Sequence, residues 1–206
     1  MTKDELQALC EEGQRYLQAT EYLDAEAVLA RAESVGWAQR DWDTLARLYM
    51  PLQEARRQRR QKCSEGRVGS FVGKIDPDEI VREFPSGTVL VASDSIHPAL
   101  RVREIAGEKK LYLDVFLGTV QAEQIRIIPG ARMPEPALVF KLGDEPSDMM
   151  GLWERLHGPF LAAADAEKDP VRKIEKYRDT IEVDYACELA HQRLADVAHA
   201  LARRKM

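Results

Sequence analysis

The sequence predicts an α+β protein in which helical hairpins at both ends flank a small, mostly antiparallel β-rich middle. Residues from about 3 to 63 carry apolar side chains at helical spacing and few helix breakers. Residues from about 68 to 143 hold most of the prolines and the runs of β-branched residues. Helical spacing returns after about residue 147. These changes divide the 206-residue chain into three expected segments, 1–66, 67–146 and 147–206.

Composition and charge exclude several classes of protein. With 45% hydrophobic and 32% charged residues, the chain is ordinary for a globular fold. Its 30 Lys and Arg residues are outnumbered by 35 Asp and Glu residues, which argues against a protein whose whole surface is built for nucleic acid or anionic lipid and leaves only a local basic patch for that role. No apolar run reaches the roughly eighteen residues that a membrane helix needs. The acidic, helical start of the chain does not resemble a leader either, so we expect a cytoplasmic protein. Because the three cysteines are far apart in sequence, we expect reduced thiols.

The first segment opens with a predicted αα-hairpin that turns near Thr20. Apolar and small side chains share one face of each helix. The face of the first helix carries Leu6, Leu9, Cys10, Gly13, Tyr16 and Leu17, and that of the second carries Ala25, Val28, Leu29 and Ala32. Because Gly13 has no side chain and Ala25 and Ala32 have small ones, we expect the two helices to approach closely at these positions.

This hairpin resembles a single tetratricopeptide repeat over residues about 6–37. The residues that follow the repeat pattern are Gly13, Tyr16, Tyr22, Ala25, Leu29 and Ala32. The chain departs from the pattern at Leu9, Glu12 and Trp37, and no second repeat follows. The resemblance implies a concave helical face that binds a peptide of a partner protein. The residues expected to touch that peptide are Gln7, Cys10, Gln14 and Leu17.

A third helix is expected over residues 41–62, with Asp41 as N-cap and a kink at Pro51. Its end is basic and carries Arg56, Arg57, Arg59 and Arg60. Two interpretations stay open. The cations complement the C-terminal dipole of a solvated helix end, or they form a docking patch for an acidic partner, phosphate groups or RNA. The stretch has no aromatic residues for base stacking, which argues against RNA.

The middle segment is expected to hold a short helix capped by Asp76 and Pro77, followed by strands. The expected strands cover residues 88–92, 111–117, 124–128 and 137–141. Residues 98–106 fit either a helix in a parallel βαβ crossover or a strand in an antiparallel meander. The alternation of Arg101, Val102 and Arg103 before a Gly-containing turn favours the meander.

Polar residues follow the first of these strands. Ser93, Asp94, Ser95 and His97 offer a nucleophile, an acid and a base within five residues. Catalytic triads draw their groups from separate elements, so this cluster is better explained by turn chemistry. The chain has no nucleophile elbow, phosphate-binding glycine loop or zinc-protease helix. The sequence therefore predicts no catalytic residue, no cofactor and no metal site.

The last segment is expected to form a second helical hairpin. Asp169 and Pro170 begin one helix, and another starts at about residue 184. Both hairpins carry broad apolar faces. The leading hypothesis is a non-enzymatic adaptor that uses the repeat-like helical surface to bind another protein or a second copy of itself. The alternative is a small enzyme or ligand-binding domain with its site at the end of strand 88–92, using Asp94 and His97.

Overall fold

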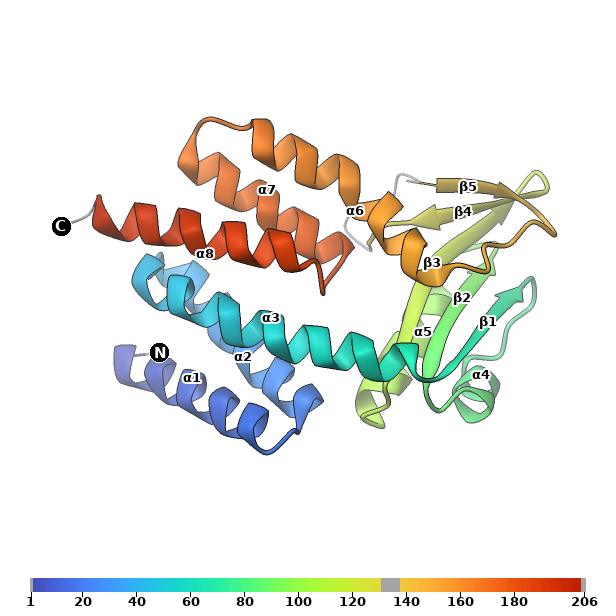
Figure 1. The fold of residues 1–206 in the computed structure, drawn as a ribbon. Helices are drawn as coiled ribbons and strands as arrows, with labels where there is room; N and C mark the ends of the chain where they lie inside the picture. Colours follow the sequence, from blue (N-terminus) through green and yellow to red (C-terminus); the bar gives the residue numbers. More distant parts are fainter. Residues whose placement is uncertain (1, 131–137, 205–206) are drawn as a thin grey trace. The chain divides into compact units, whose positions relative to one another are not determined.

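A computed structural model gives the structure of residues 2–130 and 138–204 (Figure 1). These residues form eight helices and one five-stranded sheet, which confirms the predicted α+β class. They divide into two compact units. The first unit consists of Met1–Arg59, Pro159–Ile181 and Tyr185–Met206, and the second of Arg60–Gly158 and Glu182–Asp184. The two helical ends of the chain therefore belong to the same unit.

The predicted αα-hairpin is formed by α1 (Lys3–Gln18) and α2 (Tyr22–Gln39). A capping box begins α1, since the Thr2 hydroxyl accepts the Glu5 N–H while the Glu5 carboxylate accepts the Thr2 N–H. The two helices approach closely at Gly13, where an added Cβ atom would lie 2.5 Å from the Leu29 side chain. Packing therefore requires a residue without a side chain at this position.

The third helix is α3 (Trp42–Ser64), close to the predicted bounds, and its residues up to Arg59 belong to the first unit. Asp41 precedes it and accepts hydrogen bonds from the backbone N–H and the hydroxyl of Thr44, at 3.1 and 2.9 Å. These bonds satisfy groups that a helix N-terminus leaves without partners inside the helix. Between α2 and α3, the indole N–H of Trp37 donates to the hydroxyl of Tyr49 at 2.7 Å.

The C-terminal segment contains three helices where we predicted a hairpin of two. They are α6 (Met149–Ala166), α7 (Pro170–Val183) and α8 (Glu188–Arg203). The carboxylate of Asp169 accepts the N–H groups of Val171 and Arg172, as expected of an N-cap. The last helix begins four residues later than predicted because Cys187 occupies its N-cap position.

One apolar core fills the first unit. Buried residues of α1, α2 and α3 share a single cluster with Ala164 of α6 and with the apolar faces of α7 and α8. Its largest fully buried side chains are those of Tyr49 and Tyr177. The broad apolar faces of the two ends are therefore buried against one another within one chain. Covering them does not require a second copy.

The second unit is built on a mixed sheet in the order β1-β2-β3-β4-β5. Its strands are β1 (Arg67–Val72), β2 (Gly87–Ser93), β3 (Leu113–Gln121), β4 (Gln124–Ile128) and β5 (Leu138–Lys141). The first three strands are parallel and the last three antiparallel. The expectation of a mostly antiparallel sheet was therefore wrong for β1 to β3. Ala137, where we expected the last strand to begin, lies outside the described residues.

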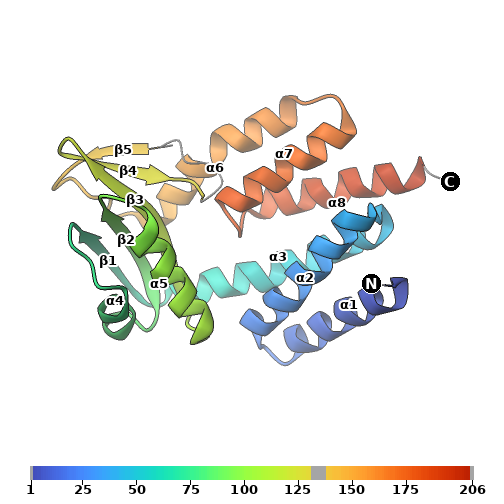
Figure 2. The same cartoon turned by 180° about the vertical axis from the view of Figure 1, so that it is seen from behind.

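The helices α4 (Pro77–Glu83) and α5 (His97–Glu108) connect the parallel strands. Residues 98–106 are therefore helical, and the predicted meander was wrong. The buried residues of α5 follow helical spacing, since Ala99, Val102 and Ile105 are three apart and Ala106 lies four after Val102. Figure 2 shows α5 lying across β2 and β3. Parallel neighbours need such a crossover because the end of one strand and the start of the next lie at opposite edges of the sheet.

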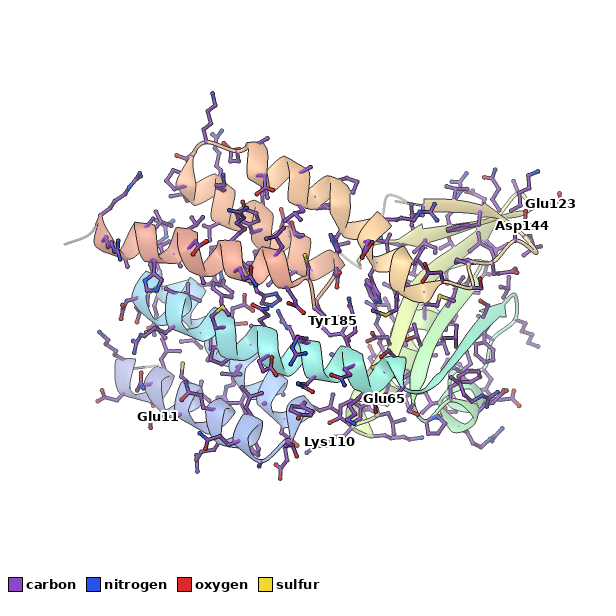
Figure 3. The ribbon with its side chains drawn as sticks, viewed as in Figure 1. Glu11, Glu65, Lys110, Glu123, Asp144 and Tyr185 are labelled. Carbon is purple, nitrogen blue, oxygen red and sulfur yellow. The ribbon has the colours of Figure 1, made fainter. Side chains whose placement is uncertain are left out.

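Side chains cover both faces of this sheet. On one face, α4 and α5 form an apolar cluster with residues such as Val115 and Leu117 of β3. Phe116 between them points to the other face, where its ring centroid lies 4.2 Å from that of Trp153. Figure 3 labels Glu123, which lies in the turn between β3 and β4, and Asp144, which follows β5. The Leu142 N–H donates to the Glu123 carbonyl at 2.9 Å and so links the end of β5 to this turn.

Candidate functional site: a cavity between α1 and α3

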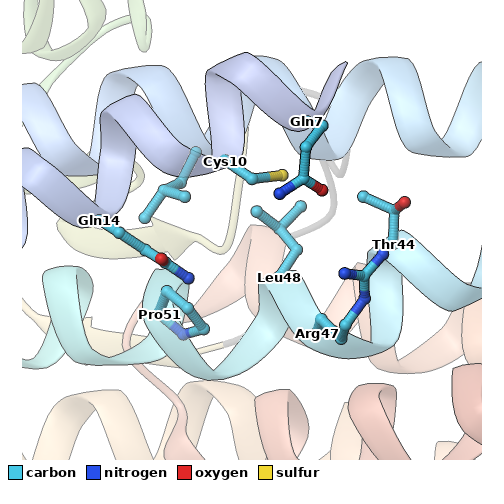
Figure 4. Close-up of a pocket in the computed structure, with 8 residues that line it drawn as sticks. Gln7, Cys10, Gln14, Thr44, Arg47, Leu48 and Pro51 are labelled. Carbon is cyan, nitrogen blue, oxygen red and sulfur yellow. The ribbon is translucent and has the colours of Figure 1, made fainter. Parts of the chain in front are cut away.

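A cavity of about 80 Å³, here called the α1–α3 cavity, opens in the first unit (Figure 4). Its lining residues are Gln7, Cys10 and Gln14 of α1, Leu29 of α2, and Thr44, Arg47, Leu48 and Pro51 of α3. Three of the four residues that we expected to touch a partner peptide are among them. The fourth, Leu17, is not, because its side chain packs against the core of the unit.

Helical periodicity explains why these residues meet. Gln7, Cys10 and Gln14 are spaced by three and four residues, so they form one stripe along α1. Thr44, Leu48 and Pro51 repeat this spacing on α3. In Figure 4 the two stripes face each other, with the Cys10 thiol between Gln7 and Leu48. The cavity is therefore a consequence of two local patterns and of the packing that brings them together.

The floor of the cavity is apolar and its rim is polar. Leu29 and Leu48 of the lining are buried, with exposed fractions of 0% and 2%. The amide side chains of Gln7 and Gln14 are exposed at the rim. Arg47 is also exposed, and its guanidinium pairs with Asp43 at 3.0 Å. The cavity thus combines a small apolar pit with an exposed polar rim, where the Gln7 amide N–H also donates to the Glu11 carboxylate at 3.0 Å.

Among the side chains that line the cavity, the half-buried Cys10 carries the functional group with the greatest intrinsic reactivity, a thiol. Burial raises the pKa of its thiol, and the positive charge of Arg47 opposes this only in part. The nucleophile in thiol chemistry is the thiolate, which a raised pKa disfavours at neutral pH. Cys10 therefore contributes packing surface to the cavity, and thiol catalysis there is disfavoured.

The predicted basic docking residues of the first unit are engaged in ion pairs within the chain. The Glu26 carboxylate lies 3.3 Å from Arg56 Nε and 2.8 Å from Arg59 Nη1. Burial alone would raise the pKa of Glu26, but the two guanidinium groups outweigh it and lower that pKa. Arg57 pairs with Glu54 at 2.8 Å near the surface. Their charges are thus balanced by nearby carboxylates.

The fourth basic residue, Arg60, belongs to the second unit and is also paired. Its Nη1 atom lies 2.7 Å from Asp184 Oδ1, and its guanidinium carbon lies 4.3 Å from the Trp153 ring centroid. A second carboxylate, that of Asp114, lies 3.6 Å from its Nε atom. Sequence reasoning missed these partners because they are more than fifty residues away along the chain.

The alternative site at the end of β2 is not assembled as a catalytic cluster. The Ser93 hydroxyl is buried and donates to the Ser95 carbonyl at 2.8 Å. Asp94 and His97 are exposed. Of the nearby arginines, Arg103 donates to the Val115 carbonyl at 2.6 Å. These contacts agree with the turn chemistry expected of the segment, and neither Asp94 nor His97 lines the α1–α3 cavity.

Comparisons with protein-family models, with curated proteins and with solved structures return no match. Within the described ranges 2–130 and 138–204, no helix is both long enough and apolar enough to cross a bilayer. The candidate site is accordingly defined by the residues and geometry of this chain.

Proposed function

We propose that this protein is a non-enzymatic adaptor that binds an extended segment of another protein at the α1–α3 cavity. The observation that carries the proposal is the joint placement of Gln7, Cys10 and Gln14 on the rim and wall of one cavity with an apolar floor. The resemblance of the N-terminal hairpin to a tetratricopeptide repeat supports the same surface.

The volume of the cavity favours a side chain over a small-molecule ligand. Sites for cofactors and substrates enclose about 300 to 1,000 Å³, and a cavity of about 150 Å³ holds benzene. At about 80 Å³, the α1–α3 cavity is too small for either. It has room for one aliphatic side chain. The occupant is therefore a segment that inserts a single valine or leucine side chain between α1 and α3.

The rim residues supply the matching polar contacts. A glutamine amide offers both a donor and an acceptor, which is the combination that a peptide group needs. Gln7 and Gln14 are separated by about 10 Å at 1.5 Å of helix rise per residue. An extended peptide covers this length with about three residues at roughly 3.3 Å each. One anchor residue in the cavity then places its two neighbours within reach of the two amides.

A defined probe tests this proposal. The probe is the blocked peptide Ser-Thr-Leu-Thr-Ser, and its matched control carries Ala in place of Leu. We expect the side-chain amide resonances of Gln7 and Gln14 to shift saturably when the leucine peptide is added to ¹⁵N-labelled protein. The alanine peptide should bind at least tenfold more weakly, because each buried methylene contributes about 0.8 kcal/mol.

Variants of the protein separate this site from others. Cys10→Leu fills the cavity and should abolish saturable binding, whereas Gln18→Ala on the exposed end of α1 should leave it unchanged. Unchanged thermal midpoints show that both variants are folded. Equal binding of the two peptides, or undiminished binding to Cys10→Leu, would refute the proposal.

A further inference from the structure

The strand β1 leaves one edge of the sheet without a partner strand. In the part of the chain that the structure describes, β1 pairs only with β2, in register from Arg67 to Val72 without a bulge. The Gly73 N–H donates to the Ala92 carbonyl of β2. Because backbone groups of a strand alternate in direction, those of Val68 and Ser70 point away from β2. These groups are available to an added strand.

Strand addition at a sheet edge is usually hindered by devices such as a proline or a bulge. Within the described residues, the register of β1 with β2 contains no bulge. The six residues of β1 contain no proline. Val68 is 54% exposed, and Ser70 is exposed as well. An edge with these properties is suited to pairing with an extended segment.

The two faces of β1 differ in chemistry. Phe71 points toward α4, since its ring centroid lies 5.2 Å from that of Phe84 at the end of this helix. Arg67 points the same way, with its guanidinium carbon 4.5 Å from the Phe84 centroid. By alternation, Val68 and Ser70 lie on the opposite face. A strand added to β1 therefore meets α4 with one set of its side chains and an exposed valine with the other.

A cavity of about 150 Å³ lies beside this edge, between the end of β1 and α4. Phe71, Ile75 and Ile80 supply its apolar part. Its acidic part consists of Asp76, Glu79 and Glu83, and Lys74 is the one cation in the lining.

The acidic groups of the lining remain accessible to a further cation. Glu79 and Glu83 pair with Arg82 and Arg67 at 3.4 and 3.9 Å, and all four side chains are more than half exposed. Exposed pairs of this kind contribute little and exchange readily with other partners. A lysine or arginine fits this cavity because its aliphatic stem covers apolar surface while its charged head reaches the carboxylates.

We infer that β1 and the adjoining cavity bind an extended segment of a partner protein in which basic and aliphatic residues alternate. The segment adds to the sheet as a sixth strand beside β1. Its lysine or arginine side chains face α4, where one enters the cavity and meets Glu79 and Glu83. Its aliphatic side chains lie on the other face and cover Val68. This surface belongs to the second unit and is independent of the α1–α3 cavity.

Fluorescence anisotropy with labelled peptides tests this inference on the full chain. The probe is an eight-residue peptide in which Lys and Val alternate. One control peptide has Glu in place of Lys, and a second has Pro in place of the two central Val residues. We expect saturable binding of the first peptide. This binding should weaken as salt is raised from 50 to about 300 mM, because salt screens the attraction between the lysines and the exposed carboxylates of Glu79 and Glu83. Neither control peptide should bind saturably.

Two variants connect this binding to the structure. Ser70→Pro removes an N–H that points away from β2 and therefore keeps the β1–β2 hydrogen bonds. It should reduce affinity at least tenfold. The double variant Glu79→Gln and Glu83→Gln should reduce affinity about fivefold. The matched control, Glu104→Gln with Glu108→Gln, makes the same charge change on exposed positions of α5 and should bind as the unaltered protein does.

Several results would overturn the inference. Binding of the Lys-Val peptide that Ser70→Pro does not weaken, in a variant with an unchanged circular dichroism spectrum, excludes strand addition at β1. Equal binding of the Glu-Val peptide excludes a basic partner. Concentration-dependent dimerisation that Ser70→Pro abolishes, without peptide binding, would make a second copy of the chain the occupant instead.

Discussion

Arg60 Nη1 lies 2.7 Å from Oδ1 of Asp184, and this ion pair is buried in the second unit. The other carboxylate oxygen of Asp184 accepts a hydrogen bond from His157 Nδ1 at 2.6 Å. Burial alone would raise the pKa of Asp184. The hydrogen bond from His157 and the charge of Arg60 outweigh burial, so the pKa of Asp184 is below its ordinary value.

Replacing Asp184 with Asn is expected to lower the free energy of unfolding at pH 7 by about 3 kcal/mol, because Arg60 would lose the nearer of its two carboxylates. Since the folded-state pKa is depressed, the stabilisation by Asp184 is complete above its unfolded pKa of about 3.9 and is lost as pH falls through the folded value. Urea denaturation at several pH values checks this. Asp144→Asn, at an exposed position, is the control. A difference that stays constant down to pH 2 would contradict the assignment.

Gly13→Ala is expected to destabilise the protein by about 1 to 3 kcal/mol, because a Cβ atom at this position would lie 2.5 Å from the buried side chain of Leu29. Gly107→Ala in α5 is the matched control, since an added Cβ there meets no heavy atom within 4 Å. That change should stabilise the helix by roughly 0.5 to 1 kcal/mol. Thermal denaturation of both variants measures the two effects. Changes of the same sign would show that the close approach of α1 and α2 is not required.

Arg56 and Arg57 are adjacent in sequence but should differ strongly in their contribution to stability. Arg56 is buried, pairs with Glu26, and its Nη1 donates to His191 Nε2 at 3.1 Å. Arg56→Ala should cost about 3 kcal/mol, because it leaves buried polar groups without their partner. Arg57→Ala should change stability by less than about 0.5 kcal/mol, since its pair with Glu54 is largely exposed. Equal effects in chemical denaturation would show that Arg56 is not a structural cation.

Features that depend on neighbouring residues could be predicted from the sequence. The capping groups Asp41, Asp76 and Asp169 act within one helical turn, and each precedes a helix where expected. The close approach at Gly13 followed from the small residue itself. The secondary structure of residues 98–106 was harder to predict, because two patterns overlap there. Val102 and Ile105 are three residues apart, as in a helix, whereas Arg101 and Arg103 flank Val102 with the alternation of a strand. The parallel pairing of β2 with β3, which α5 connects and packs against, decided between helix and strand.

The candidate sites likewise combine local features that the sequence shows with features that only the tertiary structure provides. The stripe of Gln7, Cys10 and Gln14 on α1 is visible in the sequence, but the opposing wall from α3 is not. The edge strand β1 was not predicted, because its residues Val68, Gly69 and Ser70 give neither a buried run nor a clear alternation.

The sequence by itself determined the α+β class, the starts of α3, α4 and α7, and which residues share a face of α1. These features arise from caps and from side chains three or four positions apart, which interact within a single helix. The tertiary structure decided the parallel direction of β1 to β3, the pairing of Arg60 with Asp184 and the enclosure of the α1–α3 cavity. Each of these joins residues far apart along the chain, so it is fixed only when the apolar faces pack and bring those residues together.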